Sequence, residues 1–309
     1  MSQNKIIIIA GPTASGKSAL AIDVAKAFNG VVINSDSMQV YKHMPIITAC
    51  PDKKEKELIE HRLFEIYEPD VKGNVVDWLN LAVNEIKSVW AQNKTPVIVG
   101  GTGLYIDNLI NGTTPIPETP TEIRQKTASL LQEKGPHFLH QELEKIDSES
   151  AAKISHNDIT RLSRALEVFE HTKIPLSVWH KKPMLKKLPE ADFFVIKICP
   201  TAEELDARCY LRFDKMIEAG ALDEIRFLNS LNLNDNLPAM RALGVPELLE
   251  FVRGNTSIEV AIENAKLHTR QYAKRQRTWF KNKLKADFEI TECYKGDFTL
   301  IREAILKQF

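Results

Sequence analysis

The 309-residue chain has few cysteines, no long hydrophobic run and no excess of charge of either sign. Its four cysteines lie far apart and form no Cys-x-x-Cys pair, which argues against a disulfide scaffold and against a zinc site. The longest apolar run, from Ile6 to Gly11, is far shorter than the roughly 18 residues that cross a bilayer. No charged start precedes an apolar block. We therefore expect a cytoplasmic protein without a secretory signal or membrane segment.

The charges of the chain cancel. Lysine plus arginine and aspartate plus glutamate each number 41, so the formal net charge is zero. This balance excludes a cationic coat over the whole protein but allows a local basic patch. Apolar residues make up 43% and charged residues 27% of the chain, which are ordinary globular values and exclude the disordered, collagen and coiled-coil classes.

Short apolar segments alternate with helical patterns in the first third of the chain. Strands are expected at residues 5–10, 31–33, 62–66 and 96–99, and helices at residues 17–28 and 75–92. This alternation indicates a parallel sheet with right-handed crossovers. One further strand pattern, FFVIKIC, returns at residues 193–199, and only helical patterns follow it.

The alternation stops at a proline-rich stretch, Pro115, Pro117 and Pro120, after which the pattern is helical to about residue 180. The sequence therefore predicts an α/β protein of the P-loop NTPase type with an inserted all-helical domain. The core is expected to comprise residues 1–115 and 186–309, and the helical insertion residues 116–185.

Residues 11–18, GPTASGKS, match the phosphate-loop pattern G-x-x-x-x-G-K-[ST] between a predicted strand and a predicted helix. The glycines let successive N–H groups face one anion, and the helix N-terminus adds partial positive charge. Lys17 supplies a cation, and the Ser18 hydroxyl is placed to hold Mg²⁺. The motif predicts a polyphosphate site, as in nucleotide-binding and ATP-binding proteins, formed by Gly11, Pro12, Thr13, Ala14, Ser15, Gly16, Lys17 and Ser18.

The acid that usually supports Mg²⁺ in kinases and NTPases is not found where it is expected. The strand at residues 96–99 ends in Gly100 and Gly101 rather than in an aspartate. The strand-terminal acid near the loop is Asp36, which we expect on the strand next to the phosphate loop. Open α/β sheets bind ligands at the carboxyl ends of their strands, so Asp36 is a candidate functional residue rather than a turn residue.

A basic segment lies near the end of the chain, and it contains no acidic residue between Lys266 and Lys285. The spacing of Lys266, Arg270, Lys274, Arg277 and Lys281 predicts a ladder of cations on one face of a helix. Tyr272, Trp279 and Phe280 interleave with these cations. In a chain without net charge, this segregation favours nucleic acid as a partner over a merely solvated face.

Motifs along nearly the whole chain resemble those of the tRNA dimethylallyltransferase (isopentenyl-tRNA transferase) family. In the family's order they are GPTASGKS, DSMQVYK, HRLFEI, VIVGGTGLY, RLSRALEV, PLSVWH, RFDKMIEAGALDE, MRALGVPELLEF and TRQYAKRQRTWFK. The segments GGTGLY, DSMQVY and KRQ-x-TW are more specific than the phosphate loop. No C-terminal zinc finger of the eukaryotic kind follows, so the chain resembles the bacterial type.

The resemblance implies transfer of the dimethylallyl group of dimethylallyl diphosphate to N6 of the adenosine at tRNA position 37, immediately 3′ of the anticodon. It implies a general base in Asp36, a hydroxyl near the reacting amine in Thr102, and a further cation on the diphosphate in Arg212. The tRNA contacts that it implies are Asp36, Ser37, Met38, Gln39, Thr102, Arg124, Thr160, Arg161, Leu162, Ser163, Arg164, Met240, Arg241, Ala242, Leu243, Gly244, Val245, Lys274, Arg275, Gln276, Arg277, Thr278, Trp279, Phe280 and Lys281.

The chemistry fits these residues. The amine becomes positive as it attacks the allylic carbon, so an ordinary carboxylate suffices as base. The phosphate loop and Mg²⁺ would neutralise the leaving diphosphate. The adenosine must leave the stacked anticodon loop to be reached. We expect a monomer whose partners are the donor and a tRNA with unpaired adenosines.

Two departures from the family pattern and three rival functions stay open. Cys50 stands where the family usually has lysine, and Arg62 where it has the second of two histidines. The rivals are a small-molecule kinase, which leaves the basic segment unexplained, and a non-catalytic RNA-binding protein, which leaves the intact phosphate loop unexplained. An isopentenyltransferase acting on free adenylate would not need a long basic surface.

Overall fold

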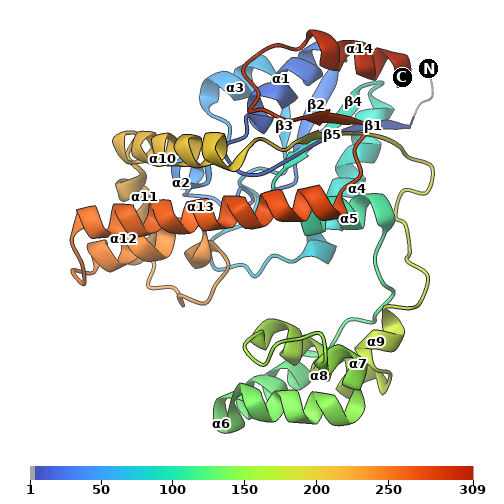
Figure 1. Cartoon of the computed structure of the whole chain (residues 1–309), viewed down its shortest axis with the longest axis vertical. Helices are drawn as coiled ribbons and strands as arrows, with labels where there is room; N and C mark the ends of the chain where they lie inside the picture. Colours follow the sequence, from blue (N-terminus) through green and yellow to red (C-terminus); the bar gives the residue numbers. More distant parts are fainter. Residues whose placement is uncertain (1–3, 309) are drawn as a thin grey trace. The chain divides into compact units, whose positions relative to one another are not determined.

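The structure is a computed structural model that describes residues 4–308. The chain forms two compact units, Met1–Ile110 with Lys187–Phe309, and Asn111–Lys186. Figure 1 draws the smaller unit in green and yellow-green, between the two parts of the larger unit in sequence. Among the described residues, none of the helices combines the length and the apolar character needed to cross a membrane.

The larger unit is built on a six-stranded parallel sheet with the order β3-β2-β4-β1-β5-β6. Its strands are β1 (Lys5–Ala10), β2 (Gly30–Asn34), β3 (His61–Arg62), β4 (Thr95–Gly100), β5 (Asp192–Ile198) and β6 (Phe288–Ile290). The predicted α/β class is confirmed.

Three details of the sheet differ from the sequence prediction. The third strand comprises only His61–Arg62 rather than residues 62–66, because Leu63 and Glu65 adopt positive φ angles that end the extended chain. The edge strand β6 was not predicted. Strand β2 is not next to β1, because β4 lies between them; a crossover connection can leave room for a strand that comes later in the chain.

Both faces of the sheet are covered, which explains why its strands are apolar at every position. In β1, Ile6 and Ile8 point into one hydrophobic cluster, and Ile7 and Ile9 point into another. The second cluster lies under α1 (Lys17–Ala27) and α14 (Thr299–Gln308), and the first, larger cluster includes α4 (Val75–Ala91) and α5 (Gly103–Asn111). Figure 1 shows α14 and α1 together on one side of the sheet.

The remaining helices of the larger unit lie in two groups. The short helices that follow β2 are α2 (Pro45–Thr48) and α3 (Lys53–Leu58). After β5 the chain forms α10 (Ala202–Glu218), α11 (Ala221–Ser230), α12 (Val245–Val252) and α13 (Ile258–Lys283). Helix α13 is the long orange-red helix in Figure 1, and it packs against α10 and α12.

The smaller unit has a hydrophobic core of its own. Its helices are α6 (Thr121–Ile146), α7 (Ser148–Ala151), α8 (Ile159–Thr172) and α9 (Leu176–Trp179). Helix α6 is interrupted at Gly135, whose φ of 78° is not helical, just before Pro136. On α8, Leu162, Ala165 and Val168 recur at helical spacing and are buried in this core.

Candidate active site

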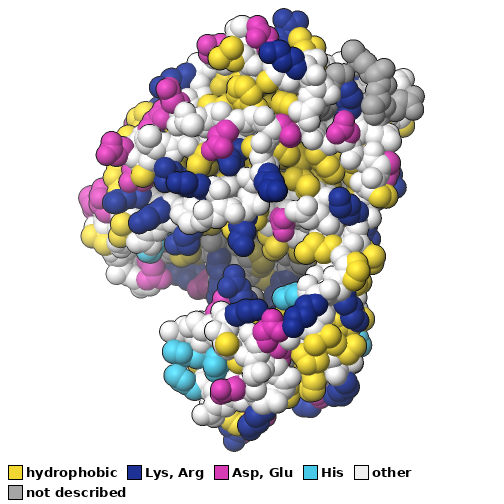
Figure 2. Space-filling model, turned by 45° about the vertical axis from the view of Figure 1, so that its right-hand side comes forward, with side chains coloured by type: hydrophobic (Ala, Val, Ile, Leu, Met, Phe, Trp, Pro, Cys, Tyr) yellow, Lys and Arg dark blue, Asp and Glu magenta, His cyan; other side chains and the backbone are white. Residues whose placement is uncertain are grey.

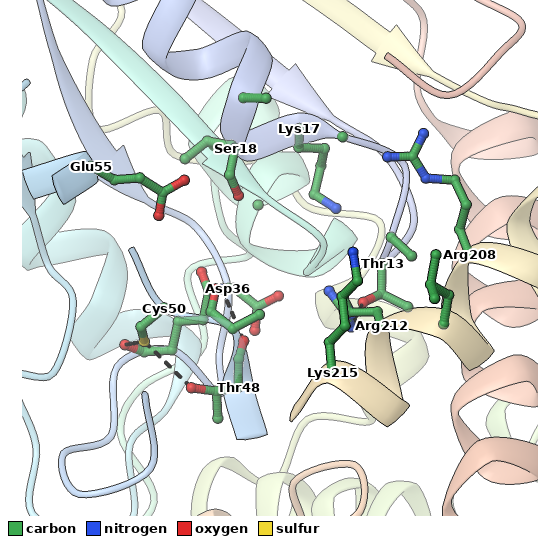
Figure 3. A pocket seen from close by; sticks show the side chains of 18 residues that line it. Thr13, Lys17, Ser18, Asp36, Thr48, Cys50, Glu55, Arg208, Arg212 and Lys215 are labelled. Carbon is green, nitrogen blue, oxygen red and sulfur yellow. Dashed lines mark hydrogen bonds between the residues drawn. The ribbon is translucent and has the colours of Figure 1, made fainter. Parts of the chain in front are cut away.

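The carboxyl ends of β1, β2 and β4 open onto one cavity of about 410 Å³. Its lining joins the phosphate loop to the segments after β2, to α3 and to α10. The side chains labelled in Figure 3 are Thr13, Lys17, Ser18, Asp36, Thr48, Cys50, Glu55, Arg208, Arg212 and Lys215. The basic groups lie together on one side of this view, and the two carboxylates lie on the other. The cavity therefore combines an anion-binding wall with an acidic wall.

The phosphate loop is held closed by its own side chains. The Lys17 ammonium donates to the Pro12 carbonyl at 2.6 Å, and the Ser15 hydroxyl donates to the same oxygen at 2.8 Å. Gly16 has a φ of 93°, and a Cβ there would lie 2.8 Å from the carbonyl oxygen of Tyr294, so only glycine fits. Burial lowers the pKa of Lys17 to about 8, and an anion beside the ammonium would raise it again.

Helix α10 supplies the rest of the cationic wall. Arg208, Arg212 and Lys215 line the cavity, and their spacing of four and three residues places them on one helical face. The Arg212 guanidinium donates to the hydroxyl of Thr13 in the phosphate loop. Burial lowers the pKa of Arg212, yet a guanidinium stays protonated in proteins. Our sequence prediction included Arg212 but missed Arg208 and Lys215, which the same spacing would have indicated.

Asp36 lies on the opposite wall, in a turn fixed by the preceding strand. Its carboxylate accepts the backbone N–H of Met38 at 2.9 Å, and its own N–H donates to the Asn34 side chain at 2.8 Å. The buried Asn34 amide also donates to the carbonyls of Asp36 and Leu63, both at 3.0 Å. Asn34, which the sequence prediction did not single out, thus orients the loop that carries Asp36.

Thr102 lies between the loops that follow β2 and β4. Its hydroxyl accepts the N–H of Ser37 at 2.9 Å and lies 3.2 Å from the Ser37 hydroxyl, to which it donates. A Cβ on Gly100 would collide with the Ser35 backbone, so glycine is required where the two loops approach. The structure therefore shows Thr102 holding the Asp36 loop, a contact that the sequence prediction had not anticipated.

The turn around Cys50 adds neutral groups to the lining of the cavity. The Gln39 amide donates to the carbonyls of Thr48 and Ala49 at 3.0 and 2.7 Å. Burial raises the pKa of Cys50 to about 12, so its thiol is neutral where the family usually has a cation. The other departure, Arg62, pairs with Glu60 and Glu85 away from this cavity.

Ser18 is the residue of the loop that could hold Mg²⁺. Its side chain is exposed and lines the cavity. Among residues 4–308, no three His, Cys, Asp or Glu side chains form a metal-binding group. A single hydroxyl suits Mg²⁺ bound mainly by substrate phosphate oxygens and water, so the residues present fit this ion only together with a phosphorylated ligand.

The cation ladder expected on α13 is only partly free. The Lys266 ammonium lies 2.7 Å from the Asp214 carboxylate, and Arg270 lies 2.8 Å from Asp206. Both acidic residues come from α10, so these ion pairs fasten the two helices together. Their charges contribute less to the field outside the protein than the sequence pattern suggested.

The second half of α13 carries the exposed basic surface. Lys274, Arg275 and Lys281 are exposed, whereas Arg277 donates to the carbonyl of Pro200 at 2.7 Å. A shallow groove of about 430 Å³ lies along this half, lined by Lys274, Arg275, Thr278, Trp279, Asn282 and Lys283. In Figure 2, Lys and Arg side chains gather across the middle of the larger unit, at the level at which α13 crosses it in Figure 1.

The contacts predicted in the smaller unit differ in exposure. Thr160 and Arg161 are exposed, and Arg161 pairs with Asp158 at 3.3 Å. Arg164 is half-buried and donates to the Thr119 hydroxyl at 2.7 Å. Arg124 is exposed. A cavity of about 450 Å³ within this unit is lined in part by Thr160, Arg161 and Arg164.

Several predicted RNA contacts have buried side chains. They are Leu162, Met240, Ala242, Val245, Gln276 and Phe280. In the described structure these side chains pack inside the protein, and their contact with RNA stays a prediction. Their neighbours Arg241, Lys274 and Thr278 are exposed. The resemblance identifies segments, and only the structure separates the outward-facing side chains from those that hold each segment in place.

Comparison with known proteins points to one family. Residues 39–283 match the family model described as IPP transferase. The chain is 42% identical over 283 residues to the tRNA dimethylallyltransferase of Granulibacter bethesdensis, covering 92% of this chain and 88% of the relative. It is 40% identical over 304 residues to that of Rhodospirillum centenum, with 98% and 95% covered.

Solved structures agree with the sequence relatives. A eukaryotic dimethylallyltransferase, described as acting on tRNA, superposes with a TM-score of 0.82 at 31% identity, covering 98% of this chain and 78% of that one. The tRNA isopentenylpyrophosphate transferase of Bacillus halodurans gives a TM-score of 0.71 at 30% identity, covering 99% and 96%.

Proposed function

Because the chain belongs to the IPP transferase family, we propose that it transfers the dimethylallyl group of dimethylallyl diphosphate to N6 of the adenosine at tRNA position 37. The observation that carries this proposal is the cavity in which the phosphate loop and the cations of α10 face Asp36. Diphosphate and modified tRNA are the products. A monomer is the proposed acting form, and a tRNA substrate is consistent with a cytoplasmic location.

The cationic wall serves the leaving group. As the bond between the allylic carbon and the bridging oxygen breaks, its electron pair goes to the diphosphate. Lys17, Arg208, Arg212 and Lys215, together with the N–H groups of the phosphate loop, are positioned to neutralise that charge. When bound, Mg²⁺ held by Ser18 would add further neutralisation. A phosphate loop used in this way activates a leaving group and transfers no phosphoryl group.

The acidic wall serves the nucleophile. The N6 nitrogen forms a bond to the allylic carbon and becomes positively charged, and one of its protons passes to the Asp36 carboxylate. The Met38 N–H and the Asn34 side chain hold this carboxylate and its loop in place. Thr102, through Ser37, fixes the same loop. These contacts, which hold Asp36 in the cavity, support its proposed role as the general base.

The target adenosine must be presented as a single-stranded, extruded nucleotide, because a stacked adenine cannot enter the cavity. The exposed cations of α13 and the exposed residues Arg124, Thr160 and Arg161 of the smaller unit are the proposed contacts with the tRNA backbone. Because the Cys50 thiol is neutral, it adds no positive charge to the cavity. The diphosphate of the donor would therefore be bound by the cations of the opposite wall.

A small-molecule kinase is disfavoured by the end of β4. In such enzymes, an acidic residue at a strand end usually supports the Mg²⁺ of the nucleotide. Here β4 ends at Gly100, and Gly101 and Thr102 follow. The carboxylate that is present, Asp36, lies at the end of β2 and faces the cations across the cavity.

The proposed function is tested by mass analysis of tRNA nucleosides. The purified protein, Mg²⁺ and dimethylallyl diphosphate are incubated with unmodified tRNA whose anticodon loop carries consecutive adenosines. We expect one dimethylallyl group on adenosine 37, and none on a tRNA with another base at that position. Phosphate transfer from ATP without any mass gain would favour the kinase instead.

The exposed cations of α13 are expected to control tRNA affinity. Replacing Lys274 and Arg275 by alanine should weaken tRNA binding and lower the slope of log Kd against log salt concentration by roughly 1.4, about 0.7 per released counterion on single strands. Fluorescence anisotropy at several salt concentrations measures both quantities. Lys274 and Arg275 are both exposed, so little loss of stability is expected.

The matched control is the double variant Lys266→Ala and Arg270→Ala. It removes two charges from the same helix, but these charges are already paired with Asp214 and Asp206. We expect a smaller change in the salt slope than for the first pair. Equal slopes for both variants would show that the exposed half of α13 is not the RNA-binding surface.

A further inference from the structure

Two polar side chains of α13, Thr269 and Gln276, are buried in the protein, and Gln276 is the longer of the two. The buried positions of this helix include Ala261, Ala265 and Ala273, whose small side chains let it approach the core closely. Gln276 continues the same buried face and is only 7% exposed. A long polar side chain at such a position must be hydrogen-bonded, because a buried unpaired amide is costly.

Both ends of the Gln276 amide are used. Its carbonyl oxygen accepts the backbone N–H of Thr13 at 2.8 Å, and its nitrogen donates to the carbonyl of Gly101 at 2.7 Å. A Cβ on Gly101 would lie 2.5 Å from that nitrogen, so the contact requires glycine there. The side chain thus spans two backbone segments that belong to different loops.

These two loops are the ones that diverge from neighbouring strands. The pairing of β1 with β4 ends at Ala10 and Gly100. Beyond that pair the chains separate, one into the phosphate loop and the other toward Thr102. The Gln276 amide bridges the gap, so it continues the cross-strand pairing by means of a side chain.

Each bridged loop carries one half of the site. The Thr13 hydroxyl accepts from Arg212 on the cationic wall. Thr102, directly after Gly101, holds the loop of Asp36 through Ser37. A displacement of either loop would change the distance between the donor's diphosphate and the base.

We propose that Gln276 is a positioning residue that sets the spacing between the phosphate loop and the Gly101–Thr102 turn, and that it couples the basic helix to both. The proposal rests on the proposed function only in taking diphosphate as the ligand of the phosphate loop. Gln276, which the sequence prediction placed among the tRNA contacts, would then support the phosphate loop and the Gly101–Thr102 turn instead.

The test compares Gln276→Met with Gln271→Met. Gln271 is exposed on the same helix, so the control makes the same chemical change without removing the bridge. Titration calorimetry with inorganic diphosphate and Mg²⁺ gives donor-site affinity without turnover. Steady-state kinetics give kcat and KM for the donor, and anisotropy gives the Kd for tRNA.

For Gln276→Met we expect diphosphate affinity and kcat to fall by about tenfold or more, with the tRNA Kd within about twofold of the Gln271→Met value. Gln276→Asn, which keeps an amide too short to reach both partners, should change in the same direction and serves if the methionine variant does not fold. Equal diphosphate affinity in the Gln276 and Gln271 variants would overturn the proposal. So would a parallel loss of tRNA affinity, which would indicate general damage to α13.

The two proposals fail separately. If the wild-type protein binds diphosphate but modifies no tRNA, the proposed function is wrong, and the calorimetric comparison still decides the role of Gln276. If the wild-type protein modifies tRNA and Gln276→Met behaves like its control, only the positioning role is wrong.

Discussion

Replacing Asp36 by asparagine is expected to lower kcat for dimethylallyl transfer by about 10²–10⁴-fold, the usual contribution of a general base. The asparagine keeps the shape of the side chain and an oxygen that can accept the Met38 N–H, as Asp36 does at 2.9 Å. The loop should therefore keep its conformation. Diphosphate affinity and the tRNA Kd should stay close to those of the wild-type protein.

The control is Glu55→Gln, which neutralises the other carboxylate lining the same cavity. Glu55 is part of the capping box at the start of α3, where its side chain accepts the Asp52 N–H at 2.9 Å, and glutamine can make the same bond. Single-turnover rates with saturating donor and tRNA separate chemistry from binding. A rate for Asp36→Asn equal to that of the wild-type protein would remove Asp36 from the mechanism.

Much of the sheet could be predicted from local patterns. The strand at Lys5–Ala10 is a continuous β-branched run between turn residues, and the phosphate loop follows it directly. In contrast, β6 consists of only Phe288–Ile290, and its pairing with β5 supplies the stability that its own sequence lacks. The order of the strands could not be predicted from local patterns either, because long-range packing places β4 between β2 and β1.

The sequence predicted the site residues that lie in motifs, but not the residues that pack around them and hold them in place. The sequence indicated Lys17, Asp36 and Arg212 because each lies in a recognisable segment. It did not indicate that Asn34 orients the Asp36 loop, because a buried hydrogen bond across 29 residues, from Asn34 to Leu63, leaves no local pattern.

The basic segment also could be predicted only in part, because its sequence does not reveal its tertiary contacts. Helical spacing correctly placed its cations on a helix, but spacing within α13 carries no information about α10. The pairing of Lys266 with Asp214 is a tertiary contact. The inward direction of Gln276 is another, and it depends on how closely the alanine face of α13 approaches the core.

Replacing Arg212 by methionine is expected to lower kcat/KM for the donor by about 10²–10³-fold, the loss seen when one preorganised donor to a developing anion is removed. The guanidinium lines the cavity and donates to the Thr13 hydroxyl, so it would meet a bound diphosphate with little reorganisation. Arg212→Lys should recover part of the loss, because it keeps the charge but not the planar fork. The Kd for tRNA should be unchanged.

An exposed arginine outside the cavity, Arg226, provides the control. Arg226 on α11 pairs with Asp223 at 2.7 Å, away from the cavity, so Arg226→Met makes the same substitution without touching the donor site. Thermal unfolding of both variants separates loss of stability from loss of donor binding, and diphosphate affinity is measured by calorimetry. If Arg212→Met matches Arg226→Met in diphosphate affinity and in kcat/KM, the cations of α10 do not serve the leaving group. The phosphate loop would then have to neutralise the diphosphate without help from α10, and the function of the cationic wall would need another explanation.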